Sequence, residues 1–219
     1  MSVRENFDAQ LKELKDELLE LGNLAQNALK QSIIALKNQD VEKALQIIEN
    51  DYKINNLESD INDKVILMIA KQQPVATDLR RLIVALKIST DLERIGDLAV
   101  NIAKSIIRIG EEPFVKPIEE IPKMAETARG MIKDVLQAFY DEDVVAAKNI
   151  ADSDDEVDQK YGKLIKELLE IVTNNPEWIA QITQLTFICR FIERAADHAT
   201  NISESVIYLV KGKYYDLNS

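Results

Sequence analysis

Apolar residues recur at steps of three and four along most of the chain. In the first such stretch, from about residue 5 to residue 37, they are Leu11, Leu14, Leu18, Leu21, Ala25, Ala28 and Leu29. An α-helix completes a turn in 3.6 residues, so this spacing puts the apolar side chains on one face. The pattern predicts a long amphipathic helix whose apolar face lies against a core.

Turn-forming residues divide the same periodicity into six predicted helices. Their approximate ranges are 5–37, 40–71, 75–109, 121–140, 143–173 and 177–210. Asp40 and Asp143 stand where the second and fifth helices begin, and an Asp side chain there can accept a hydrogen bond from the free N–H groups of the first turn. Pro74 and Pro176 mark two of the turns between helices.

The chain is predicted to contain two copies of a three-helix unit. Proline is concentrated between residues 113 and 122, and this linker separates residues 1–112 from residues 113–219. When the first half is shifted by 103 residues, Asp40 falls on Asp143 and many apolar positions coincide. In the last helix of each half the offset is 100, and residues 93–102 (ERIGDLAVNI) match residues 193–202 (ERAADHATNI). We therefore predict an all-α fold of two tandem three-helix bundles, each able to bury its own apolar stripes.

Composition narrows the possible partners. The chain has 219 residues, only 6 Gly and 5 Pro, and a net charge of -11. A nucleic-acid-binding protein needs a basic patch to neutralise phosphates, and none is evident. The acidic balance also argues against adsorption to anionic lipid, and no apolar run could serve as a signal peptide or a membrane span. The single cysteine, Cys189, fits a reducing compartment, so we expect a cytoplasmic protein.

The repeated motif carries the candidate chemistry. Positions four residues apart share a helix face, so Glu93, Asp97 and Asn101 form one oxygen-bearing stripe. Glu193, Asp197 and Asn201 form another. Two carboxylates at this spacing repel each other by a few tenths of a kcal/mol, and a bound cation would compensate. Carboxylate and carboxamide oxygens suit Mg²⁺, Mn²⁺, Ca²⁺ or ferric iron.

Alternatives to a metal site remain open at this stage. Arg94 and Arg194 could neutralise the carboxylates through salt bridges, and acidic stripes are often merely solvated. His198 is more often a hydrogen-bonded residue than a ligand, and Cys189 is best explained as a small buried residue. Acidic and amide residues on the second helix of each half could complete a site. These are Asp51, Asn55 and Glu58 in the first half and Asp154 and Asp158 in the second.

The sequence has no pattern typical of a known catalytic site. It lacks a Gly-rich phosphate loop, a His-rich hydrolase signature and the Glu-x-x-His pairs of ferritin-like di-iron proteins. A metal-dependent phosphohydrolase that uses the two acidic groups remains one alternative function. A helical scaffold in which the carboxylates have no role is another.

The duplicated Glu-Arg-x-x-Asp-x-x-x-Asn-Ile motif, in a chain of two units of about 105 residues, resembles the PhoU family. The resemblance implies a regulator without enzymatic activity that links the Pst phosphate transporter, through its ATPase component, to a sensor histidine kinase. It implies repression of the phosphate-starvation response when phosphate is plentiful. It also implies a homodimer, no direct membrane insertion and metal ions (Mg, Mn, Zn or Fe) on Glu93, Asp97, Glu193 and Asp197. Leu98 occupies a position where the family commonly has His.

Overall fold

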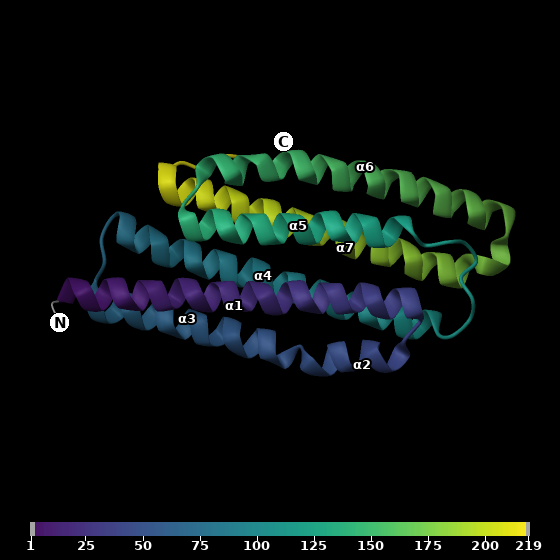
Figure 1. Ribbon diagram of the computed structural model, residues 1–219, viewed down its shortest axis with the longest axis horizontal. Coiled ribbons are helices and arrows are strands. Elements are labelled where there is room, and N and C mark those ends of the chain that lie inside the picture. Colours follow the sequence, from purple (N-terminus) through teal and green to yellow (C-terminus); the bar gives the residue numbers. More distant parts are fainter. Residues whose placement is uncertain (1–2, 218–219) are drawn as a thin grey trace.

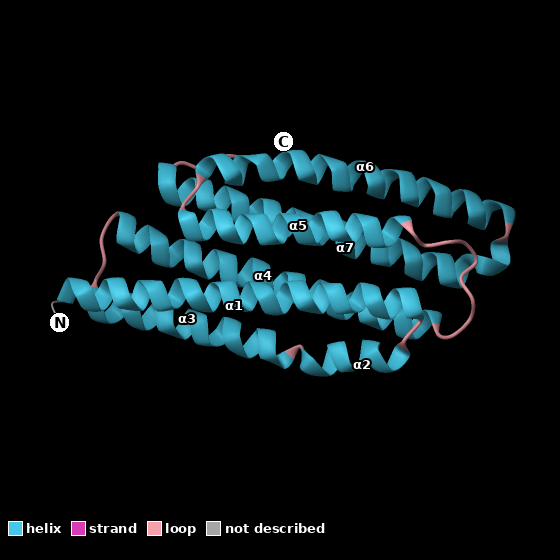
Figure 2. Cartoon of the chain, viewed as in Figure 1, coloured by secondary structure: helices cyan, strands magenta, loops and turns pink. Residues whose placement is uncertain are grey.

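The computed structural model describes residues 3–217, and the described chain is helical with short connections (Figure 2). Its elements are α1 (Val3–Asn38), α2 (Val41–Asn50), α3 (Tyr52–Gln72), α4 (Thr77–Ile109), α5 (Glu120–Asp141), α6 (Val144–Asn174), the 3-10 helix η1 (Pro176–Trp178) and α7 (Ile179–Lys211). The all-α prediction is confirmed, and most of the predicted helix ends lie within a few residues of the observed ones.

Both predicted caps form. The carboxylate of Asp40 accepts a hydrogen bond of 2.8 Å from the backbone N–H of Lys43. The carboxylate of Asp143 accepts hydrogen bonds from the backbone N–H groups of Val145 and Ala146, at 2.8 and 3.1 Å. Each cap satisfies donors that have no partner inside the helix, so the two units begin their second helix in the same way.

One predicted helix is interrupted. The sequence periodicity predicts one helix over residues 40–71, but the structure breaks it at Asp51 into α2 and α3. The N–H of Asp51 reaches only the carbonyl of Ile48, at 3.4 Å, and the side chain of Asn50 donates to the carbonyl of Gln46 at 2.7 Å. Asn and Asp side chains compete with helical hydrogen bonds in this way, and apolar periodicity does not detect the competition.

The two three-helix units pack side by side along their length. The first unit consists of α1, the interrupted second helix (α2 and α3) and α4, and the second unit consists of α5, α6 and α7. Helices α4 and α7 are adjacent in the middle of the molecule (Figure 1). Helix α1 also lies beside α5, and a Cβ on Gly22 of α1 would collide with Leu136 of α5. The buried apolar residues of both units belong to one continuous core.

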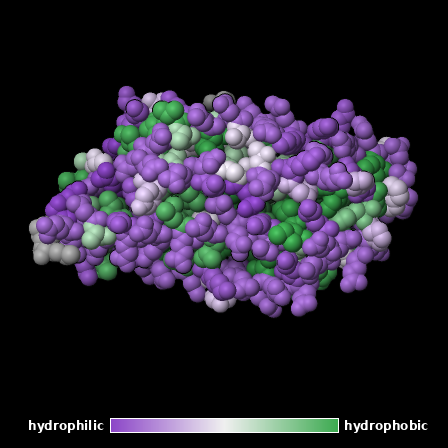
Figure 3. Space-filling view, in the orientation of Figure 1, coloured by the Kyte–Doolittle hydropathy of each residue, from purple (hydrophilic) through white to green (hydrophobic). Residues whose placement is uncertain are grey.

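One face of the molecule is predominantly polar. Hydrophilic residues cover most of the face in Figure 3, and apolar residues reach it in scattered patches. Within residues 3–217, no helix has an apolar stretch long enough to span a bilayer.

Candidate functional site

The repeated motif lies in the middle of the two central helices. Glu93 and Asp97 are on α4, which packs against α3, and Glu193 and Asp197 are on α7, which packs against α6. In each unit the neighbouring helix contributes further carboxylates, as its helical spacing suggested. Two acidic groups result, which we call the α3–α4 group (Asp51, Glu58, Glu93 and Asp97) and the α6–α7 group (Asp154, Asp158, Glu193 and Asp197).

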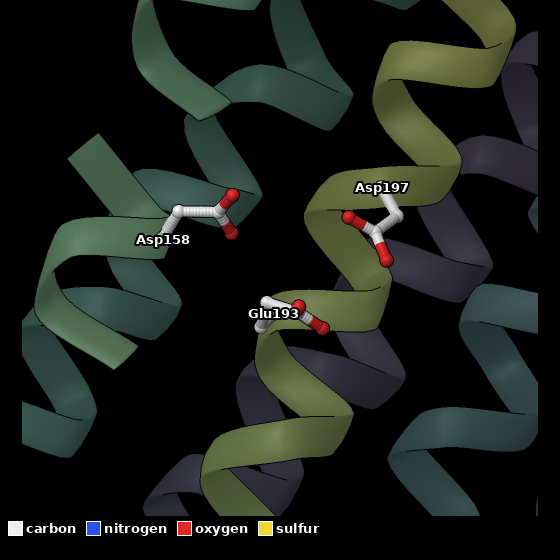
Figure 4. A group of neighbouring side chains, drawn as sticks. All are labelled: Asp158, Glu193 and Asp197. Carbon is white, nitrogen blue, oxygen red and sulfur yellow. The ribbon is translucent and has the colours of Figure 1, made fainter. Parts of the chain in front are cut away.

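Three carboxylates of the α6–α7 group converge. Asp158, Glu193 and Asp197 each offer one oxygen atom, and these oxygens all lie within 4.8 Å of one another. Asp158 projects from α6 toward α7, where Glu193 and Asp197 stand on successive turns (Figure 4). Oxygens bound to one cation at 2.0–2.6 Å lie no more than about 5 Å apart. The three carboxylates are therefore close enough to share an ion.

Burial makes the negative charge of this group unfavourable. It raises the pKa of Glu193 from 4.5 to about 7, an effect that Asp197 increases and Arg190 opposes. It also raises the pKa of Asp154 from 3.8 to about 6, with Asp197 and Asp158 adding to the rise. The pKa of Asp197 is likewise raised, chiefly by burial. At neutral pH a proton or a bound cation would relieve this charge.

Some oxygens of the α6–α7 group have no partner. Glu193 Oε2 and Asp154 Oδ1 are buried without a hydrogen bond among the described residues. Arg190, three residues before Glu193, donates to the other oxygen, Oε1. Asp197 forms no hydrogen bond or ion pair within the described chain. An unpartnered buried carboxylate oxygen is costly, and a cation would satisfy it.

The α3–α4 group is neutralised differently. Arg94 pairs with both motif carboxylates, at 3.4 Å from Glu93 and 2.9 Å from Asp97. Burial raises the pKa of Glu93. The charge of Asp97 adds to this rise, and the charge of Arg94 opposes it. The salt bridges that the sequence suggested for Arg94 are therefore present. For this group, the arginine supplies part of the compensation that a cation would otherwise supply.

The two groups also differ on the helix that faces the motif. Asn55 of α3 occupies the repeat position of Asp158, and its side chain donates to Asp51 at 3.0 Å. The α3–α4 group thus has an amide where the α6–α7 group has its third converging carboxylate. Among residues 3–217, the only three-carboxylate convergence of this kind is in the second unit.

Comparison with known proteins identifies the family. The profile of the PhoU domain matches the chain twice, over residues 18–106 and 121–206. The chain belongs to the PhoU family. The resemblance inferred from the duplicated motif is confirmed, and each match lies within one of the two three-helix units.

Several PhoU relatives match over almost their whole length. A phosphate-specific transport system accessory protein PhoU homolog of Clostridium acetobutylicum is 41% identical, with 99% of each chain covered. One from Aquifex aeolicus is 40% identical over 93% of this chain and 92% of the relative. The crystal structure of the phosphate transport system regulatory protein PhoU of Streptococcus pneumoniae superimposes with a TM-score of 0.90 at 33% identity, covering 96% and 99%. PhoU of Pseudomonas aeruginosa also gives 0.90, at 34% identity, covering 94% and 100%.

The other candidate residues of this PhoU chain lie outside the three converging carboxylates. His198 Nδ1 lies 2.9 Å from Asp91 of α4, a hydrogen-bonding role of the kind expected for a lone histidine. Asn201 borders a hollow between α4 and α7, while Asn101 is half-buried one turn after Asp97. Cys189 is buried, and burial raises its pKa to about 12, which favours an inert packing residue.

Sequence reasoning missed one partner of the site. Arg194 is the alternative counter-ion that the sequence suggests for the second motif, but it is exposed, and Arg190 pairs with Glu193 instead. The signal was available, because residues three apart on a helix are neighbours. The alignment of the two repeats indicates Arg194 instead, because Arg194 aligns with Arg94.

Proposed function

We propose that this protein is an accessory regulator of phosphate-specific transport that represses the phosphate-starvation response. In this role it acts in the cytoplasm as a homodimeric adaptor, without catalysis, between the ATPase of the Pst transporter and a sensor histidine kinase. The observation that carries the proposal is the 41% identity, over 99% of both chains, to a relative named as a transport accessory protein. A mainly polar helical surface is consistent with function through protein contacts.

Two experiments test the regulatory role. Deletion of the gene in its host should switch on alkaline phosphatase in phosphate-rich medium, and a plasmid copy should restore repression. The full-length protein should also retain both the transporter ATPase and the cytoplasmic region of the kinase in a pull-down. Repression that survives a clean deletion would remove the assignment. If neither partner is retained, the adaptor mechanism fails, even where the deletion phenotype appears.

We further propose that the α6–α7 group binds one divalent or ferric cation, Mg²⁺, Mn²⁺, Zn²⁺ or iron. The supporting observation is the convergence of three carboxylates, one of which has a buried oxygen without a partner. Glu93 and Asp97 would form a second, weaker site, because Arg94 already pairs with both. Asn101 and Asn201 are secondary contributors in this proposal.

The carboxylates also suit a metal-dependent phosphohydrolase, because a cation bound there could polarise a phosphate ester. The purified protein should therefore be incubated with a phosphomonoester and each metal in turn. We expect no turnover above that of a variant with Asp197→Asn. Metal-dependent turnover lost in that variant would favour the enzyme over the adaptor.

A further inference from the structure

The first unit contains a pocket that the regulatory proposal does not use. It lies between α1, α2 and the start of α3, where the second helix is interrupted at Asp51. Its volume is about 330 Å³, at the lower end of the range for small-molecule sites. The three converging carboxylates of the α6–α7 group belong to the other unit.

The floor of the pocket is apolar. Five aliphatic side chains from four helices line it: Leu24, Ala28, Ile47, Ile54 and Val100. Ile47 and Val100 are each only 8% exposed and Ile54 only 3%, so the floor is fixed by core packing. A fixed aliphatic surface suits the face of a flat ring, whose burial is favourable and needs no hydrogen bonds.

Carboxamides with free hydrogen-bonding atoms form one side of the pocket. Gln31 donates to Asn27 Oδ1 at 3.4 Å, which leaves Asn27 Nδ2 as a free donor and Gln31 Oε1 as a free acceptor. Gln46 lies on the α2 side of the pocket, and its own carboxamide has no partner in the described chain. A single Asn or Gln binds the N6/N7 edge of adenine with its own donor and acceptor, and here Asn27 Nδ2 and Gln31 Oε1 would supply one each.

Two lysines and one carboxylate complete the polar lining. Lys43 and Lys53 form no ion pair within the described chain, although the protein carries a net charge of -11. Lys53 Nζ lies 5.9 Å from the centre of the Tyr52 ring, so neither lysine is neutralised by a carboxylate. Ammonium groups without an ion-pair partner beside a pocket favour an anionic ligand, and phosphate oxygens are their common partners. Asp51 also lines the pocket, and a carboxylate there can accept a hydrogen bond from a ribose hydroxyl.

The second unit repeats only part of this chemistry. At the repeat positions of Asn27, Gln31, Lys43 and Lys53 the chain has Gly130, Asp134, Ala146 and Glu156. The helix that corresponds to α2 and α3 is also continuous there, as α6. The Asn27–Gln31 pair and the two lysines are thus properties of the first unit, whereas Gln46 and Asp51 have polar counterparts, Asn149 and Asp154, in the second.

We infer that this pocket binds an adenine mononucleotide. The base lies on the aliphatic floor with its N6/N7 edge against Asn27 and Gln31, and the ribose faces Asp51. The phosphate lies between the ammonium groups of Lys43 and Lys53. The inference is independent of the adaptor role and of the α6–α7 group, and it shares only Asp51 with the α3–α4 group.

Isothermal titration calorimetry on the full-length protein tests the site with AMP, adenosine, GMP and inorganic phosphate. We expect AMP to bind at one site per chain and to bind at least about tenfold more tightly than adenosine or GMP, because each substitution loses a charge-assisted or paired hydrogen bond. Phosphate alone should give no measurable heat. The absence of AMP binding at millimolar concentration, or phosphate binding equal to that of AMP, would overturn the inference.

Matched variants locate the site. The double substitution Lys43→Ala with Lys53→Ala should weaken AMP at least about tenfold and leave adenosine unchanged. A control with Lys30→Ala and Lys148→Ala removes the same charge from exposed lysines outside the pocket. Ala28→Leu should fill the floor and abolish binding of both ligands. Equal loss in the lysine control would assign the effect to net charge and overturn the inference, as would AMP binding retained in both pocket variants.

Discussion

His198 Nδ1 on α7 lies 2.9 Å from Asp91 Oδ1 on α4, and the pair joins the two three-helix units. The side chains are only 16% and 17% exposed, so solvent screens their interaction less than that of a surface pair. The repeat position of His198 is Leu98, which is buried, so the two repeats differ at this point of their interface.

Replacement of this pair should loosen the contact between the units. We expect His198→Ala to lower the free energy of unfolding by about 1–2 kcal/mol, since it removes one partner of a half-buried hydrogen bond. A double-mutant cycle with Asp91→Ala, measured by urea unfolding, should give a coupling of about 0.5–2 kcal/mol. Strictly additive single effects would show that the contact contributes nothing to stability.

The α6–α7 group predicts a pH dependence of stability. The pKa of Glu193 is about 7 in the folded protein against 4.5 without burial, so the native state binds more protons than the unfolded state between those values. The free energy of unfolding should therefore rise as pH falls from about 7.5 to 5, by roughly 3 kcal/mol at most from this group. Asp154, with a pKa of about 6, acts in the same direction.

Urea unfolding of the metal-free protein across this pH range measures the effect. In Glu193→Gln the rise should be much smaller, because the amide does not titrate. Glu170→Gln, on an exposed face of α6, serves as the control and should retain the full rise. Stability that falls on acidification in the unmodified protein would contradict the assignment of a protonated, buried Glu193.

A further consequence concerns metal binding. Mg²⁺, Mn²⁺, Zn²⁺ or iron should raise the melting temperature, because a ligand that binds only the folded state stabilises it. Asp197→Asn with Asp158→Asn should abolish most of the shift, while Asp97→Asn should remove little, since Arg94 already pairs with Asp97. The combined Asp97→Asn and Asp197→Asn variant should lose the shift altogether. An undiminished shift in that variant would exclude both motifs as the sites.

The helices and the two acidic motifs can be predicted from the sequence, whereas the break at Asp51 and the pocket cannot, for physical reasons. The period of the apolar positions fixed the helices, and the offset of 100 residues brought Glu93 and Glu193 into correspondence. The break at Asp51 could not be predicted, because it depends on local hydrogen bonds of Asn50 and Asp51. These bonds leave the helical spacing of the apolar residues almost unchanged. The pocket escaped because it depends on where the interrupted helix lies relative to α1.

A close contact between Gly96 and Ile54 gives a test of packing at the motif. A Cβ on Gly96 would lie 2.8 Å from Ile54 Cδ1, whereas the second unit has Ala196 opposite the shorter Val157. We expect Gly96→Ala to be neutral or destabilising alone, because the clash offsets its gain of about 1 kcal/mol in helix propensity. In an Ile54→Val background the same change should stabilise by about 1 kcal/mol. Thermal unfolding of the four proteins measures this, and equal effects in both backgrounds would rule out the steric coupling.

Removal of the second unit tests how far each half is self-sufficient. The predicted boundary near Pro113 suggests that residues 1–113 form a helical fragment, because α1, α2, α3 and α4 bury apolar surface against one another. However, both units share one continuous core. In the fragment, α4 would no longer be covered by α7, and α1 would no longer be covered by α5. We therefore expect a strong helical signal in circular dichroism together with concentration-dependent association in sedimentation velocity. The substitutions Leu98→Lys and Ile102→Lys on α4 distinguish the causes, since they should reduce association if the face left by α7 drives it. A fragment without helical signal at moderate temperature would mean that the two units fold only as one body.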